Sequence, residues 1–167
     1  MDLPRISLEL ATSALDGPGE LANSLVTLGV LDFEPAVRPE DARAAHGLRD
    51  AMVRCFTATI SKNALPAHDV ATLNSYASDE PPVPVLRSDG GASRNAIDPV
   101  RAAFAALARD AIETIARDAS HLRICHDENC RRIFMDRSRG KRRRWCSMQR
   151  CGNRAKIAAF RKRRTSA

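Results

Sequence analysis

Cys125-His-Asp-Glu-Asn-Cys130 and Cys146-Ser-Met-Gln-Arg-Cys151 are two cysteine pairs of identical spacing near the C-terminus of this 167-residue chain. Each pair encloses four residues, and 15 residues separate the pairs. Structural zinc is commonly held by about four thiolates in a tetrahedron, from cysteine pairs that lie roughly 15–20 residues apart. The spacing therefore predicts one structural zinc ion with the ligands Cys125, Cys130, Cys146 and Cys151.

Two histidines beside the first pair, His121 and His126, are alternative ligands. Two matched cysteine pairs make a four-sulfur site the simpler interpretation. Four protein ligands close the coordination shell, whereas catalytic zinc keeps a position for water. The sequence also shows no Gly-rich phosphate loop and no Ser/His/Asp grouping in a recognisable context. We therefore expect a structural metal site and no enzymatic activity.

The residues around the cysteines carry a family resemblance. The second pair lies in Trp145-Cys-Ser-Met148 and Cys151-Gly-Asn-Arg-Ala-Lys156, and Phe134-Met-Asp-Arg-Ser-Arg139 lies between the pairs. These motifs resemble the CGNR zinc-finger family, densely over residues 121–160 and only in layout over residues 20–120. The resemblance implies a bacterial protein with a mostly helical N-terminal domain of the ABATE type. Members are described as stress-induced transcription regulators, so the resemblance also implies a regulator.

Charge is segregated along the chain. Residues 121–167 contain 16 Lys and Arg against 3 Asp and Glu, a balance of +13. Residues 1–120 contain 11 against 17, a balance of −6, and the two parts together give the net charge of +7. A zinc ion with four thiolates offsets only about two of these positive charges. The pattern indicates a basic module that meets a polyanion, carried by a mildly acidic domain.

The start of the chain, Met1-Asp-Leu-Pro-Arg5, lacks the basic and then apolar layout of a secretory signal. No apolar run reaches the roughly 20 residues of a membrane span. We therefore expect a cytoplasmic protein, in which thiols stay reduced and favour metal over disulfides. The fifth cysteine, Cys55, lies in an apolar helical pattern and is expected to be a small buried hydrophobic residue.

We expect an α+β protein that is mostly helical, and we divide it into two domains. Residues 1–120 would form a helical domain of the ABATE type with a small β-hairpin. Asp98 is expected to cap the last helix of this domain, and the hairpin is expected to pack on the helices. Apolar spacing, prolines and turn residues predict helices at about 19–30, 39–62, 66–77 and 99–119, a short strand within 3–11, and hairpin strands at 81–86 and 92–97.

Residues 121–167 would form a treble-clef or ribbon-like zinc finger with a basic C-terminal helix. Ser147 would cap that helix, which places the second cysteine pair at its start. The helix before the finger leads almost directly into Cys125, so we expect the finger to dock on the helical domain. The predicted elements are a knuckle at 125–130, strands at 131–135 and 144–146, a turn at 139–140, and a helix over about 147–162.

Residues near the cysteines are expected to support the zinc site without binding the metal: Gly152, Asn153, Arg154 and Asp136. A glycine beside a ligand lets the backbone approach sulfur, and Asn153 can bridge backbone groups. Arg154 can hydrogen-bond a thiolate or pair with Asp136. Direct contact of Asn153 and Arg154 with nucleic acid is the alternative. The aromatic residues Phe134 and Trp145 are expected to form the small core of the module rather than base-stacking platforms.

The basic residues of the module are candidates for phosphate contact: Lys141, Arg142, Arg143, Arg144, Arg150, Arg154, Lys156 and Arg161. A basic loop together with a basic helix is what phosphate neutralisation requires. If residues 147–162 are helical, Arg150, Arg154 and Arg161 lie close to one face. We predict a zinc-containing DNA-binding protein that acts as a transcription regulator.

Two other functions fit the same sequence. The basic module could bind RNA instead of DNA. Alternatively, zinc could staple a ligand-sensing or protein-interaction module whose arginines dock on an acidic partner. The N-terminal domain would then hold a small-molecule effector or a homodimer contact. An apolar pocket with converging polar groups in the helical domain would favour the sensing function.

Overall fold

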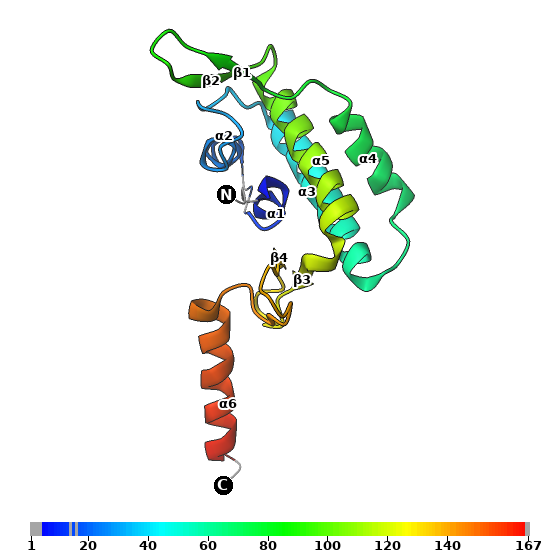
Figure 1. Ribbon diagram of the computed structural model, residues 1–167, viewed down its shortest axis with the longest axis vertical. Helices are drawn as coiled ribbons and strands as arrows, with labels where there is room; N and C mark the ends of the chain where they lie inside the picture. The colour runs from blue at the N-terminus through cyan, green and yellow to red at the C-terminus, as the bar shows by residue number, and fades with distance from the viewer. Residues whose placement is uncertain (1–4, 14, 16, 166–167) are drawn as a thin grey trace.

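The computed structural model describes residues 5–13, 15 and 17–165. A helical part with one hairpin is followed by a second small hairpin and a terminal helix (Figure 1). This mostly helical α+β architecture confirms the predicted fold class. The elements are α1 (Ile6–Leu10), α2 (Pro18–Thr27), α3 (Pro39–Ser61), α4 (Ala67–Ala77), β1 (Val83–Leu86), β2 (Ala92–Asn95), α5 (Pro99–Asp118), η1 (Ala119–His121), β3 (Leu122–Ile124), β4 (Ile133–Met135), η2 (Met148–Gly152) and α6 (Asn153–Thr165).

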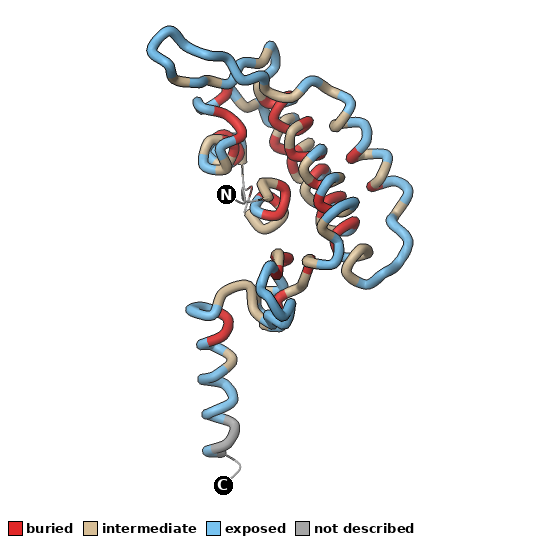
Figure 2. Tube along the Cα trace, viewed as in Figure 1, coloured by how far each residue is buried: buried red, intermediate tan, exposed pale blue. Residues whose placement is uncertain are grey.

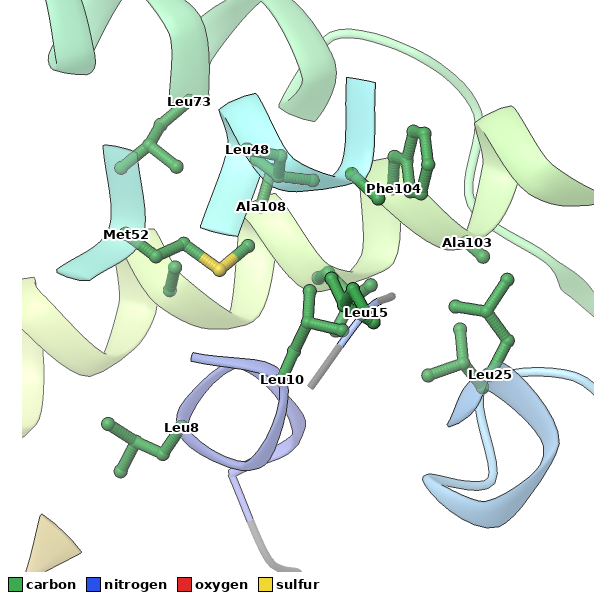
Figure 3. Packing of buried hydrophobic residues seen from close by; sticks show 14 of the residues in the cluster. Leu8, Leu10, Leu15, Leu25, Leu48, Met52, Leu73, Ala103, Phe104 and Ala108 are labelled. Atoms are coloured by element: carbon green, nitrogen blue, oxygen red, sulfur yellow. The ribbon is translucent and has the colours of Figure 1, made fainter. Parts of the chain in front are cut away.

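The core lies between the long helices α3 and α5, which run side by side (Figure 1). Leu48 and Met52 of α3 meet Phe104 and Ala108 of α5, while α4 covers the pair on one side and α1 and α2 lie on the other (Figure 3). Cys55 is fully buried in this core, which confirms that it serves as a small hydrophobic residue. Within the described ranges, no helix is both long and apolar enough to cross a membrane.

Helix starts follow the local signals of the sequence. The Asp98 carboxylate accepts a hydrogen bond from the Arg101 backbone N–H at 3.1 Å, and Pro99 occupies the first helical position of α5. Both features are typical of a helix N-terminus because the first N–H groups have no partner inside the helix. The predicted cap is therefore confirmed. Helix α3 ends at its C-terminus with Lys62, whose backbone is left-handed with φ of 56°.

The strand predicted within residues 3–11 is wrong, because residues 6–10 form helix α1. Leu8 and Leu10 are both buried, and so is Ser7, the residue before Leu8. Ser7 donates from its backbone N–H and its hydroxyl to the Asp110 carboxylate, at 2.9 and 2.6 Å. Alternation of apolar residues suggested a strand, but the partly buried Asp110 carboxylate of α5 holds the start of a helix instead. Leu3, at the start of the range predicted as a strand, lies outside the described residues. So does Asp16, the first residue of the turn-forming sequence Asp16-Gly-Pro-Gly19.

The first hairpin forms in the predicted place but does not pack on the helices as expected. β1 pairs with β2 in antiparallel register from Val83 opposite Asn95 to Leu86 opposite Ala92. Both strands are largely exposed, and the hairpin extends from one end of the molecule (Figures 1 and 2). Its link to the helical part includes an ion pair between Arg94 and Asp32 at 2.9 Å. The hairpin stays outside the core because helices already cover the core.

The second hairpin joins the zinc-finger region to the helical core. α5 passes through the short turn η1 directly into β3, which pairs with β4 from Leu122 opposite Met135 to Ile124 opposite Ile133. Leu122 and Ile133 are buried in the same cluster as the helices. The expected docking of the finger is thus confirmed, and the docked surface is apolar.

Replacing Leu122 by Ala should lower the free energy of unfolding by about 2–5 kcal/mol, since a buried leucine leaves a cavity when it is truncated. The Leu122 residue is 1% exposed, whereas Leu86 in the hairpin is 80% exposed. Leu86→Ala is therefore the matched control and should change stability by no more than about 0.5 kcal/mol. Urea unfolding of the zinc-loaded protein, followed by circular dichroism, measures both. Equal losses in the two variants would contradict a core shared by finger and helices.

Candidate metal centre

The four paired cysteines converge on one point between the second hairpin and α6. Their Sγ atoms all lie within 4.8 Å of one another. The Cys130 Sγ is 3.6 Å from that of Cys146, which in turn is 3.8 Å from that of Cys151. A tetrahedron with zinc–sulfur bonds of about 2.3 Å has edges of about 3.8 Å. The donor set therefore fits one zinc ion, and none of the cysteines is in a disulfide.

The first pair is held by a tight knuckle. The Cys125 N–H donates to the Arg132 carbonyl, and the Cys130 N–H donates to the Asp127 carbonyl, both at 2.9 Å. The Asp127 carboxylate also accepts from the Asn129 N–H at 3.1 Å, which closes a local turn. These bonds fold the chain back so that the sulfurs of two residues five positions apart in the sequence reach the same ion.

The second pair lies at the start of the C-terminal helix. The Ser147 hydroxyl accepts from the Arg150 N–H, as predicted for a helix cap. Residues Met148–Gly152 form a wide turn, and α6 continues from Asn153. A helix start carries partial positive charge, which favours thiolate. This arrangement confirms the predicted position of the second pair.

The thiols need the cation to ionise. Burial raises the pKa of Cys146 to about 12 and also raises the pKa of Cys151. Burial acts in the same direction on Cys130, but the backbone N–H of Arg132 and the neighbouring sulfurs outweigh it and lower its pKa. Zinc binding must therefore release protons, so the affinity for zinc falls as the pH falls.

Arg154 links the two halves of the site by contacts with a metal ligand and with a carboxylate of the knuckle. Its Nη2 lies 3.8 Å from the Cys151 Sγ, and its Nε lies 2.8 Å from the Asp127 carboxylate. Of the two predicted partners of Arg154, a thiolate and Asp136, the Cys151 thiolate is the one contacted, whereas Asp136 accepts hydrogen bonds from Ser138 and Arg143. Asp127 is not among the residues predicted from the sequence to support the site. Its position two residues after the first cysteine, where a carboxylate can close a turn, was the available signal.

Asp136 shapes the loop between the cysteine pairs. Its carboxylate is fully buried and accepts hydrogen bonds from the Ser138 N–H and hydroxyl, at 3.0 and 2.6 Å, and from the Arg143 N–H at 2.8 Å. The Ser138 hydroxyl, against the cost of burial, lowers the pKa of this carboxyl. The buried charge therefore fixes both ends of the segment that carries the four consecutive basic residues.

Gly152 and Asn153 lie beside the ligand Cys151. A Cβ atom on Gly152 would come within 2.8 Å of the Met148 sulfur, so the turn has little room for a side chain there. The Asn153 side-chain amide donates to the Gln149 carbonyl at 3.0 Å. These contacts are within the protein, and the supporting roles expected of both residues remain predictions.

Phe134 and Trp145 form the small core of the finger, as predicted. Phe134 is buried with Cys125 and Cys151, and Trp145 packs against the same cluster. The strand predicted at 144–146 is wrong: β4 pairs with β3 instead, because that pairing buries Ile133 in the helical core. Residues 144–146 are linked to the knuckle by the His126 N–H, which donates to the Arg144 carbonyl at 2.9 Å.

Neither alternative ligand reaches the metal site. The described residues gathered there are the four cysteines, with no histidine among them. The His121 ring nitrogen Nδ1 lies 3.0 Å from the Asp136 carbonyl, so His121 is part of the loop structure.

The structure therefore defines a helical protein with a C-terminal four-thiolate zinc finger. Residues 121–164 match the CGNR zinc finger, and residues 5–118 match the ABATE family, described as "Putative stress-induced transcription regulator". The chain belongs to the ABATE family and carries a CGNR zinc finger, which confirms the resemblance seen in the sequence. Neither match is to a family of enzymes. No curated protein matches the chain.

Replacing Cys151 by Ser should abolish stoichiometric zinc, because three thiolates and a hydroxyl hold the ion far less tightly. Cys55→Ser is the matched control, since Cys55 is buried in the helical core away from the site. The control should keep one zinc per chain and lose only packing energy. Metal analysis after dialysis against a weak chelator measures both variants. One zinc per chain in the Cys151 variant would refute this ligand set.

Asp136→Asn should destabilise the zinc-loaded protein by about 1.5–3 kcal/mol, because an amide nitrogen cannot accept from the Arg143 N–H. The lowered pKa of Asp136 means that its stabilisation is complete above the ordinary carboxyl pKa of about 3.9 and is lost only as the pH falls through the folded value. The difference from the native protein should thus be equal at about pH 6 and pH 8. Denaturant unfolding at both values tests this, with exposed Asp50→Asn as control; a strongly pH-dependent difference would contradict it.

Proposed function

We propose that this protein is a zinc-containing DNA-binding transcription regulator, in which the finger presents a basic surface to the duplex. The observation that carries the proposal is the form of α6. This helix extends away from the helical part, and most of its described residues are exposed (Figures 1 and 2). Residues 153–165 contain six Lys and Arg and no acidic residue. A projecting basic helix rooted in a metal site is suited to phosphate contact.

The loop between the cysteine pairs supplies a second basic surface. Lys141 to Arg144 are all exposed. The Arg143 guanidinium lies 5.2 Å from the centre of the Phe134 ring and donates to the Cys146 carbonyl at 2.7 Å. The Arg144 guanidinium lies 5.3 Å from the centre of the Trp145 ring. The finger core therefore orients part of this loop, which lowers the entropy cost of ordering it on a polyanion.

The remaining predicted phosphate-contact residues fall into two places. Arg150 and Arg154 lie at the root of the finger, where it faces the helical part. Lys156 and Arg161 lie further along α6 beside Ile157 and Phe160. In the proposal, the loop and the outer part of α6 meet the duplex, and Arg154 at the root holds the finger in shape through its ion pair with Asp127.

The helical domain would provide dimerisation or sensing in this proposal. Its charge is opposite to that of the finger, so it does not itself attract a polyanion. We keep the division into domains at about residue 120 as part of the proposal, with the two parts joined through Leu122 and Ile133.

The double substitution Arg142→Ala and Arg144→Ala should weaken DNA binding for all sequences. It should also reduce the slope of log affinity against log salt by up to about 0.9 for each lost phosphate contact. Arg143 is left in place because its side chain donates to Cys146. Fluorescence anisotropy with a mixed-sequence duplex, over a range of salt concentrations, measures the slope.

The matched control removes two exposed arginines of the helical domain, Arg43 and Arg87. It changes the net charge equally and should leave the salt slope unchanged. Equal slopes in the two double variants would show that the loop does not contact phosphate. A parallel titration with structured RNA distinguishes the alternative function, since tighter binding to RNA at the same salt would reject DNA as the main target.

A further inference from the structure

A cleft separates the root of the finger from the helical part of the protein. Its volume is about 540 Å³. Val53 and Thr57 of α3 form one wall, with the end of α1 beside them. The opposite wall is made by the zinc knuckle and the start of α6, and it includes the metal ligands Cys130 and Cys151. The cleft thus has a neutral side and a side built around the metal.

Four arginines line the metal side of this cleft: Arg131, Arg132, Arg150 and Arg154. Arg154 is paired with Asp127, and Arg132 has a long contact of 3.9 Å with the exposed Glu9. Across residues 5–13, 15 and 17–165, neither a hydrogen bond nor an ion pair engages the side chain of Arg131 or Arg150. The cleft therefore presents two guanidinium groups, those of Arg131 and Arg150, that no side chain of the described residues pairs.

The position of Arg131 is fixed by the knuckle. Its backbone is left-handed, with φ of 48°, and its N–H donates to the Asp127 carbonyl at 3.0 Å. A left-handed conformation is costly for a residue other than glycine, and such residues concentrate at functional sites. The same carbonyl accepts from the ligand Cys130, so the metal site and the position of Arg131 are set by one turn.

The rest of the cleft is uncharged and partly apolar. Ile124 and Ile133 contribute to it from the second hairpin, together with Val53 from α3. Thr57 is uncharged, and its hydroxyl donates a hydrogen bond to the Val53 carbonyl of its own helix at 2.7 Å. A ligand that fits needs anionic oxygens at one end and apolar atoms at the other. The volume lies within the range of about 300–1,000 Å³ typical of small-molecule sites.

We propose that this cleft binds a small phosphorylated organic molecule, with its phosphate on Arg131 and Arg150. Arginine binds phosphate oxygens in a bidentate manner, which suits two guanidinium groups that line one wall. A bound ligand touches both the finger and α3, so it fixes the orientation of the basic module on the helical part. The inference does not depend on DNA being the target of that module.

Isothermal titration of the zinc-loaded full chain tests the proposal with three probes: ATP, pyrophosphate and adenosine. ATP and pyrophosphate should bind, ATP more tightly because of its apolar part, and adenosine should bind at least tenfold more weakly than ATP. Zinc content is measured before and after each titration because phosphates chelate zinc. Failure of both ATP and pyrophosphate to bind at millimolar concentration would overturn the proposal.

Two variants and one neutral control locate the binding site. Thr57→Glu places a carboxylate opposite the arginines and should weaken ATP binding at least tenfold, whereas Thr57→Gln, of equal size but neutral, should bind ATP as the native protein does. Arg131→Gly removes the guanidinium while accepting the left-handed backbone, and it should also weaken ATP binding at least tenfold with zinc retained. Equal ATP affinity in the Glu and Gln variants would overturn the assignment to this cleft.

Duplex binding by the same two Thr57 variants separates this proposal from the function proposed above. Without ATP, both should bind duplex DNA with the affinity of the native protein, because α3 lies behind the finger root. A loss of DNA affinity in Thr57→Glu that equals its loss of ATP affinity would make the cleft part of the nucleic-acid surface and overturn the small-molecule proposal.

Discussion

Attraction between one divalent cation and four thiolates is the interaction on which the C-terminal part of this protein depends. Its core consists of little more than Phe134 and Trp145 packed on the cysteines. So small a core cannot offset the entropy of ordering the chain. Burial alone opposes ionisation of the sulfurs, as the raised pKa of Cys146 shows. The cation is therefore what makes the knuckle, the basic loop and the start of α6 a single body.

Buried carboxylates give the basic module its shape. Residues 121–167 contain three acidic residues, and two of them, Asp127 and Asp136, have almost fully buried side chains. Asp136 holds the ends of the basic loop by accepting from Ser138 and Arg143. Asp127 closes the knuckle and meets Arg154. Since the negative groups lie inside, the surface of the module remains strongly positive, which is what contact with a polyanion requires.

The finger is also part of the protein core, not an appendage on a flexible tether. Leu122 and Ile133 pack among the residues of α3 and α5. Any event that changes the contact between α3 and the finger root therefore changes how the basic surface is held. The arginine-lined cleft lies at that contact, which makes it a place where a ligand and a nucleic acid would influence each other by linkage.

Local patterns in the sequence determined the metal ligands, the four longer helices of the N-terminal part, the first hairpin, the cap at Asp98 and the segregation of charge. Each rests on spacing or on contacts within a few residues, which a single chain shows directly. Tertiary structure decided the rest. Helix α1 depends on Ser7 meeting Asp110, 103 positions away. The pairing of β4 with β3 depends on where the helical core places Ile133. The partner of Arg154 and the cleft beside it depend on how α6, the knuckle and α3 meet in space, because charges far apart in sequence interact only after the chain has folded.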